Sequence, residues 1–94
     1  SKGAIISLTR SLAAEFAHDS INVNAIAPGF IETEINTEYL RSITEEQRNN
    51  LKKRHLLGFG SPDDVAYAVV YLIGKTGRWI TGSVLNIDGG LTAI

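Results

Sequence analysis

Two short apolar runs that each end in a turn constrain the fold of this chain more than any other feature. The first, INVNAIAP (residues 21–28), is followed by Gly29, and the second, SVLNIDGG (residues 83–90), contains its own Gly-Gly stop. Each pattern predicts a short buried strand. Because a long connection separates them, we expect parallel neighbours in an α/β sheet. Two parallel strands alone make a poor sheet, which predicts one end of a larger doubly wound domain.

Helical patterns precede each of the two predicted strands. The first runs from the start of the chain to about His18, with an expected inward face of Ile5, Leu8, Leu12 and Phe16. The second begins with Ser61 as N-cap and Pro62 at the first helical position, and it should run to about Ile73, with Gly74 as a cap. Its expected inward face comprises Val65, Val69, Leu72 and Ile73.

The segment from Phe30 to Gly60 is the most polar part of the chain. Thr44 and Gln47 form a candidate capping box, which predicts the start of a short helix. We interpret the segment as a loop with short mobile helices, and residues 35–60 as a lid over a substrate. The basic stretch from Lys52 to His55 is expected to be a solvated helix end, or else the border of a substrate entrance.

Composition excludes several classes of function. The 94 residues carry a net charge of −1, so no basic surface is expected to attract nucleic acid or anionic lipid. The chain has no Cys and only two His, which leaves too few ligands for a transition-metal site. No signal peptide and no long apolar run is visible, so we expect a cytoplasmic protein with no membrane partner.

Three motifs in order resemble the short-chain dehydrogenase/reductase family. They are Ser1-Lys2-Gly3 at the head of an Ala-rich helix, NAIAPGFIET after the first strand, and ITGSVLNIDGG at the end. The resemblance covers essentially the whole chain and implies the C-terminal segment of one NAD(P)-binding Rossmann-type domain. APGFIET and ITG are most similar to the 3-oxoacyl-[acyl-carrier-protein] reductases. The implied reaction is hydride transfer between a nicotinamide cofactor and a carbonyl or secondary alcohol.

The resemblance implies that Lys2 is the Lys of the family's Tyr-x-x-x-Lys pair. The Tyr would then lie three places before Ser1, so the 94 residues alone are expected to be inactive. Tyr and Lys at i and i+4 share one helical face, and the ammonium lowers the phenol pKa so that the hydroxyl can exchange a proton. Lys2 is also expected to bind the ribose hydroxyls of the nicotinamide. A solvated Lys at a helix start is the alternative.

The turn after the first strand is the expected cofactor site. Ligands of doubly wound sheets bind at the carboxyl ends of strands, where Pro28 fixes the backbone and Gly29 allows close approach. The resemblance implies that Ile31 offers its backbone to the nicotinamide carboxamide. It also implies that Thr33 offers a hydroxyl near that amide and the pyrophosphate. An ordinary turn that ends a strand is the alternative.

Four other conspicuous residues are expected to have structural roles. His18 and His55 should face solvent, because neither has a carboxylate or second His at ligand spacing. Trp79 should pack beneath the last loop. Asn24 should satisfy buried backbone groups rather than touch a substrate.

Several alternatives stay open at this stage. The carrier-protein reductases typically have a basic residue just after the first helix, whereas Asp19 stands here and would repel an acidic carrier. A free ketone, a sugar or a coenzyme A ester is therefore as acceptable as an acyl carrier, and NAD cannot be separated from NADP. The chain could also be a stand-alone interaction module or a catalytically silent relative. The resemblance implies a homodimer or homotetramer through the Pro62–Ile73 helix and the Val84–Ile87 strand.

Overall fold

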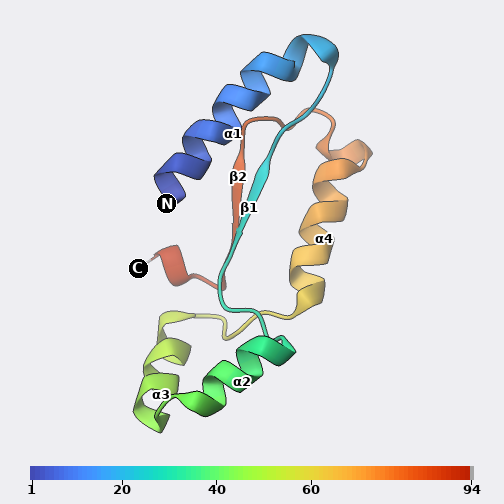
Figure 1. The fold of residues 1–94 in the computed structure, drawn as a ribbon. Helices are drawn as coiled ribbons and strands as arrows, with labels where there is room; N and C mark the ends of the chain where they lie inside the picture. The colour runs from blue at the N-terminus through green and yellow to red at the C-terminus, as the bar shows by residue number, and fades with distance from the viewer. Residues whose placement is uncertain (94) are drawn as a thin grey trace. The chain divides into compact units, whose positions relative to one another are not determined.

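The computed structural model describes residues 1–93 and shows an α/β chain with two strands. Along the sequence the elements are α1 (Lys2–Phe16), η1 (Ala17–Asp19), β1 (Ala25–Pro28), α2 (Glu34–Ser42), α3 (Glu45–Arg54), α4 (Pro62–Ile73), η2 (Lys75–Gly77), β2 (Val84–Ile87) and η3 (Leu91–Ala93) (Figure 1). The predicted helices and strands are confirmed, although both strands are shorter than their apolar runs.

The two strands pair in parallel, as predicted. The Ala25 N–H donates to the Ser83 carbonyl at 2.9 Å, and the Gly29 N–H donates to the Ile87 carbonyl at 3.0 Å. Each step of four residues along β1 matches a step of four along β2, which is the signature of parallel register. Both strands therefore end at the same edge of the sheet.

The chain forms two compact units, and each strand contributes to both. The first unit contains residues 1–27 and 67–85, and the second contains residues 28–66 and the chain from Asn86 onward. In the first unit, α1 and residues 67–73 of α4 lie on opposite sides of the strand pair (Figure 1). This two-sided covering is what a parallel strand pair requires.

The buried side chains of helices α1 and α4 in the first unit are small. Thr9 and Ala13 are the buried residues of α1, and Ala68 is the buried residue of α4. A side chain at Gly82 would meet the Ala13 methyl group at 3.4 Å, so this face of the helix lies directly against the chain before β2. The predicted inward faces are wrong in part, since Ile5, Leu8 and Ile73 are at least half exposed. Because the sheet formed by residues 1–93 has only two strands, it covers a narrow face of each helix, and the residues on that face are the small ones, Thr9 and Ala13 on α1 and Ala68 on α4.

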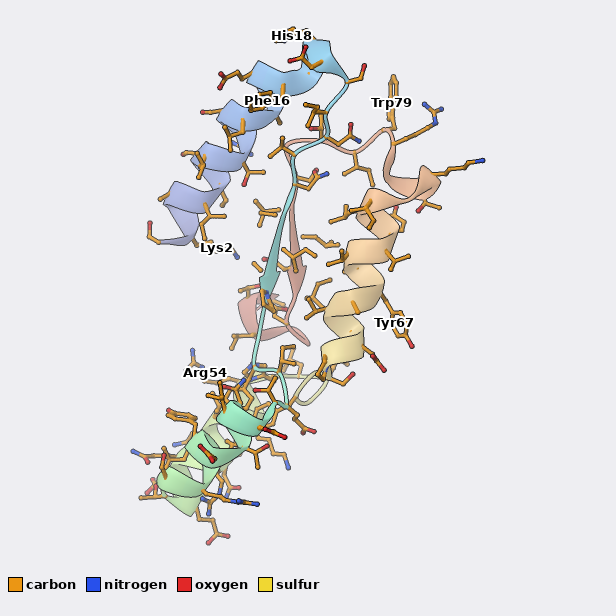
Figure 2. All side chains as sticks on the ribbon, turned by 45° about the vertical axis from the view of Figure 1, so that its right-hand side comes forward. Lys2, Phe16, His18, Arg54, Tyr67 and Trp79 are labelled. Carbon is orange, nitrogen blue, oxygen red and sulfur yellow. The ribbon has the colours of Figure 1, made fainter. Side chains whose placement is uncertain are left out.

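Asn24 joins the first strand to the loop before the second. Its Nδ2 donates to the Ile80 carbonyl at 2.9 Å, and its Oδ1 accepts from the Ser83 N–H at 3.1 Å. The expectation that Asn24 satisfies backbone groups is therefore confirmed. Trp79 differs from expectation, because it is 87% exposed and projects from the chain after η2 (Figure 2). Its ring stacks with the Arg78 guanidinium 5.9 Å from the ring centroid instead of lying under a loop.

In the second unit, the two short helices of the polar segment are well defined. Thr44 and Gln47 form the predicted capping box at the start of α3, with bonds of 3.0 and 3.1 Å. The start of α4 is held by Asp64, whose carboxylate accepts from the Ser61 N–H at 2.7 Å. The Arg48 guanidinium joins α3 to α2 by donating to the Leu40 and Ile43 carbonyls.

The turns that follow the two strands pack against each other through Gly29. A Cβ atom on Gly29 would lie 2.9 Å from the Asp88 Cα, which is closer than such contacts allow, and 3.1 Å from the His55 Nε2, which would have to shift. His55 is only 4% exposed, so the expectation that it faces solvent is wrong, whereas His18 is exposed as expected. His55 is buried because it fills the space between α3 and the turn after β1.

Replacing Asn24 with Leu should lower the free energy of unfolding of the full-length protein by about 1–2 kcal/mol. The substitution removes both hydrogen bonds and leaves the Ser83 N–H without its acceptor, while the Ile80 carbonyl keeps the bond from the Asn22 amide at 3.0 Å. Urea denaturation measures the effect. Asn24→Asp is the matched control, because it keeps the acceptor for the Ser83 N–H and should lose less. A Leu variant as stable as the wild type would show that water replaces the Asn24 amide without cost.

Replacing Gly29 with Ala should destabilise the protein by about 1–3 kcal/mol, the usual cost of forcing a group into a filled space. Gly3→Ala is the control, because no atom lies within 4 Å of a Cβ at that position in α1. The control should be neutral or more stable by up to about 1 kcal/mol. Thermal and urea unfolding of both variants give the comparison. Equal behaviour of the two would mean that the contact at Gly29 yields easily.

Candidate functional site

The turn from Pro28 to Thr33 contains four of the five predicted site residues, and all four lie in the second unit. Pro28 ends β1, and the Gly29 N–H makes the last bond to β2. The absence of a side chain at Gly29 lets the backbone lie directly against Asp88. The predicted position of the turn, at the carboxyl end of a parallel strand, is confirmed.

The turn continues as a short parallel bridge to Gly60. The Gly60 N–H donates to the Phe30 carbonyl at 3.0 Å, and the Glu32 N–H donates to the Gly60 carbonyl at 2.8 Å. In this pattern the N–H and carbonyl of the middle residue, Ile31, point away from Gly60. The Ile31 carbonyl accepts from the carboxamide Nδ2 of Asn36 at 2.6 Å. The Ile31 N–H and carbonyl are therefore oriented so that they can bind a carboxamide, and the carboxamide of Asn36 already binds the carbonyl.

Thr33 is the N-cap of α2. Its Oγ1 accepts from the Asn36 N–H at 3.2 Å, and its carbonyl accepts from the Thr37 N–H at 2.8 Å. A hydroxyl has one proton to donate and two lone pairs. Because the cap uses a lone pair, the Thr33 hydroxyl keeps its proton for a ligand oxygen.

A hollow of about 500 Å³ lies beside Thr33 over the first turns of α2. It is lined by Glu32, Thr33, Glu34, Thr37, Glu38 and Arg41. Three carboxylates against one guanidinium give this surface a negative charge. A neutral carboxamide is therefore better suited than a phosphate to this side of Thr33.

His55 holds this turn in a way that the sequence does not predict. The Phe30 N–H donates to the His55 Nε2 at 3.1 Å, and the His55 Nδ1 lies 2.9 Å from the Leu51 carbonyl. His55 follows three basic residues, a pattern that indicated a solvated helix end. No signal in the sequence distinguishes a His that accepts a backbone hydrogen bond from one that faces solvent.

The turn after β2 also contributes, although its sequence predicts only the end of a strand. The Asp88 carboxylate accepts from the Gly90 N–H at 3.1 Å and from the Thr92 hydroxyl at 2.6 Å. The Leu57 N–H donates to the Gly89 carbonyl at 2.8 Å, and Gly89 and Gly90 both have positive φ. The Asp-Gly-Gly triplet was the available signal, because consecutive glycines indicate a backbone that other side chains cannot adopt.

Lys2, the fifth predicted residue, lies in the first unit. It is the first residue of α1, where the Ser1 hydroxyl caps the helix by accepting from the Ala4 N–H at 3.3 Å (Figure 2). The side chain of Lys2 is exposed. Its position at the head of the helix agrees with the prediction, and its chemical role stays a prediction.

Residues 1–93 contain no group of three or more His, Asp or Glu side chains arranged to hold a metal ion. In the same residues, no helix combines the length and the apolar character that a membrane crossing needs.

A family model described as enoyl-(acyl carrier protein) reductase matches residues 1–92. Glucose 1-dehydrogenase 2 of Bacillus subtilis (strain 168) is 41% identical over 98% of this chain and 35% of its own length. The 3-oxoacyl-[acyl-carrier-protein] reductase FabG of Thermotoga maritima (strain ATCC 43589 / DSM 3109 / JCM 10099 / NBRC 100826 / MSB8) is 44% identical over 97% of this chain and 36% of its own.

Solved structures show the same relationship. A short chain dehydrogenase family protein from Francisella tularensis subsp. tularensis SCHU S4 matches with a TM-score of 0.85 and 30% identity, over 99% of this chain and 42% of that one. The 4-hydroxyisoleucine dehydrogenase complexed with NADH matches with a TM-score of 0.88 and 40% identity, over 99% of this chain and 38% of that one. ElxO with NADP bound matches with a TM-score of 0.82 and 36% identity, over 99% of this chain and 38% of that one.

This chain spans between 35% and 42% of the length of these proteins. The predicted resemblance and fold class are confirmed by the match along the chain and by the parallel strand pair with its helices. The chain belongs to the short-chain dehydrogenase/reductase family and has the fold of the C-terminal portion of its doubly wound, Rossmann-like sheet.

Proposed function

We propose that the full-length protein is an NAD(P)-dependent oxidoreductase that interconverts a carbonyl compound and a secondary alcohol. The observation that carries the proposal is the Ile31 backbone, whose N–H and carbonyl face away from the Gly60 bridge at the carboxyl end of β1. Related structures hold NADH or NADP, and the turn suits the carboxamide of such a cofactor because the Ile31 carbonyl already accepts a hydrogen bond from the carboxamide of Asn36.

The residues of the turn would bind the nicotinamide end of the cofactor. When bound, the cofactor supplies or accepts the hydride. The Ile31 N–H would donate to the carboxamide oxygen, and the Ile31 carbonyl would accept from the carboxamide nitrogen, as it now does from Asn36. The Thr33 hydroxyl would donate its remaining proton to the same amide. These bonds would fix which face of the ring meets the substrate.

Lys2 is proposed as the electrostatic partner of a Tyr three positions before Ser1. On a helix, those two side chains lie on one face. The ammonium of Lys2 would favour the phenolate and so let the Tyr hydroxyl give or take the alcohol proton. Lys2 would also bind the ribose hydroxyls. Residues 35–60 would form a lid, since neither α2 nor α3 has a buried residue and α3 ends in the exposed bases Lys52 to Arg54 (Figure 2).

The substrate class stays broad within this proposal. A 3-oxoacyl thioester is one candidate, because FabG proteins are among the relatives. Asp19 argues against an acyl carrier protein as the form in which the thioester arrives, because it places an exposed carboxylate after α1 where an acidic partner would be repelled. Because a glucose 1-dehydrogenase is among the relatives, a sugar is an equally acceptable substrate class.

A homodimer or homotetramer is proposed, with contacts through α4 and β2. In the first unit, α4 exposes a continuous apolar surface. Tyr67 is 70% exposed and points away from the strand pair, Val70 is 64% exposed and Ile73 is 79% exposed (Figure 2). Apolar surface of this kind is typical of interfaces between copies of a chain.

Replacing Lys2 with Ala in the full-length protein should lower turnover by roughly 100-fold or more, the scale of acid/base assistance. Steady-state rates under saturating cofactor measure the effect. Lys75→Ala is the control, because it removes the same charge from an exposed position in η2. Full turnover of the Lys2 variant would contradict the assigned role, and a wild type that binds cofactor without turnover would indicate a catalytically silent relative.

Replacing Thr33 with Val should weaken cofactor binding roughly 2- to 10-fold, the value of one neutral hydrogen bond. Calorimetric titration of the full-length protein gives the dissociation constant. Val also removes the cap of α2, so unfolding is measured in parallel. Thr33→Ser keeps the hydroxyl and the cap and should bind as the wild type does. An unchanged affinity in the Val variant would remove Thr33 from the cofactor site.

A further inference from the structure

His55 is set apart from the charged residues beside it. It follows the exposed bases Lys52, Lys53 and Arg54 at the end of α3, yet its side chain is almost fully enclosed. Phe59 encloses one side of it, with ring centroids 5.3 Å apart in an edge-to-face arrangement. Phe59 in turn lies 4.6 Å from the Phe30 ring, so the imidazole belongs to one aromatic cluster with the turn after β1.

The backbone partners of His55 determine where its proton lies. The Leu51 carbonyl, 2.9 Å from Nδ1, can only accept a hydrogen bond, so Nδ1 carries a proton. The Phe30 N–H, 3.1 Å from Nε2, can only donate, so Nε2 carries no proton and accepts this bond with its lone pair. The geometry therefore requires the neutral imidazole in a single tautomer. One nitrogen is fixed to α3 and the other holds the turn.

The bond to Phe30 fixes the peptide group between Gly29 and Phe30. That group precedes Ile31, whose backbone is the proposed contact for the nicotinamide carboxamide. Gly60 holds the opposite edge of the same segment through the Phe30 carbonyl. Gly60 therefore holds the Phe30 carbonyl, and His55 holds the Phe30 N–H. Because both peptide groups of Phe30 are held, the peptide group that carries the Ile31 N–H has little freedom to rotate.

We propose that His55 is a positioning residue that orients the Ile31 backbone for the cofactor through the lone pair of Nε2. The inference rests on the proposed function of the Pro28–Thr33 turn. The residue acts through Phe30 and touches neither cofactor nor substrate. Since His55 ends the α3 segment, it also ties the proposed lid directly to the turn that would bind the nicotinamide.

Two variants of nearly equal length separate this role from simple packing. Gln places its Oε1 acceptor about where Nε2 lies, whereas Met fills similar space without a strong acceptor. In the full-length protein, His55→Met should raise the dissociation constant for NADH or NADPH roughly tenfold, while His55→Gln should stay within about threefold of the wild type. Nicotinamide fluorescence gives the constants, and melting temperatures are measured without cofactor.

The outcomes separate the inference from the proposed function. A wild type that binds neither cofactor would overturn the proposed function and the role of His55 with it. A wild type that binds, with Gln and Met variants of equal affinity but lowered melting temperatures, would overturn the positioning role alone. Imidazole ¹⁵N spectra of the wild type without cofactor test the geometry even where a variant fails to fold. An Nε2-protonated, neutral imidazole would contradict the inference.

Discussion

The close approach of the two strand-end turns at Gly29 is the constraint on which the second unit depends. Parallel pairing brings the ends of β1 and β2 to one edge, and only a residue without a side chain lets the backbone there lie against Asp88 and His55. The Asp88 carboxylate then orders the turn after β2, whose Gly89 carbonyl holds Leu57. The position of the segment after α3 follows from these contacts.

The candidate site consists mainly of backbone groups. Ile31 and Gly60 contribute through the peptide bond, and the nearby side chains act mostly on backbone: Asn36 on Ile31, His55 on Phe30 and Thr33 on α2. A peptide held at both edges is preorganised, so little ordering would be needed on binding. Substrate selection would then fall to the more polar α2 and α3.

The first unit is organised by amide side chains and small residues rather than by large apolar ones. Asn22 and Asn24 bind the carbonyls of the chain between α4 and β2, while Ala13 and Ala68 permit close helix packing. Large side chains such as Tyr67 and Trp79 stay exposed. Surface of this kind is what a protein places against further parts of its fold or against another copy.

Local signals in the sequence determined the elements of this protein. The capping box at Thr44, the Ser-Pro start of α4 and the Pro-Gly stop of β1 act through neighbours a few residues away, so their patterns predicted the helices and the strands. The long connection between the two strands predicted that they pair in parallel. The burial of His55 and the choice of Ala13 over Leu8 as the inward residue were decided only by tertiary structure. Both depend on contacts between segments that are distant in sequence, such as the hydrogen bond between Phe30 and His55. A local sequence pattern carries no information about which distant segment a side chain will contact.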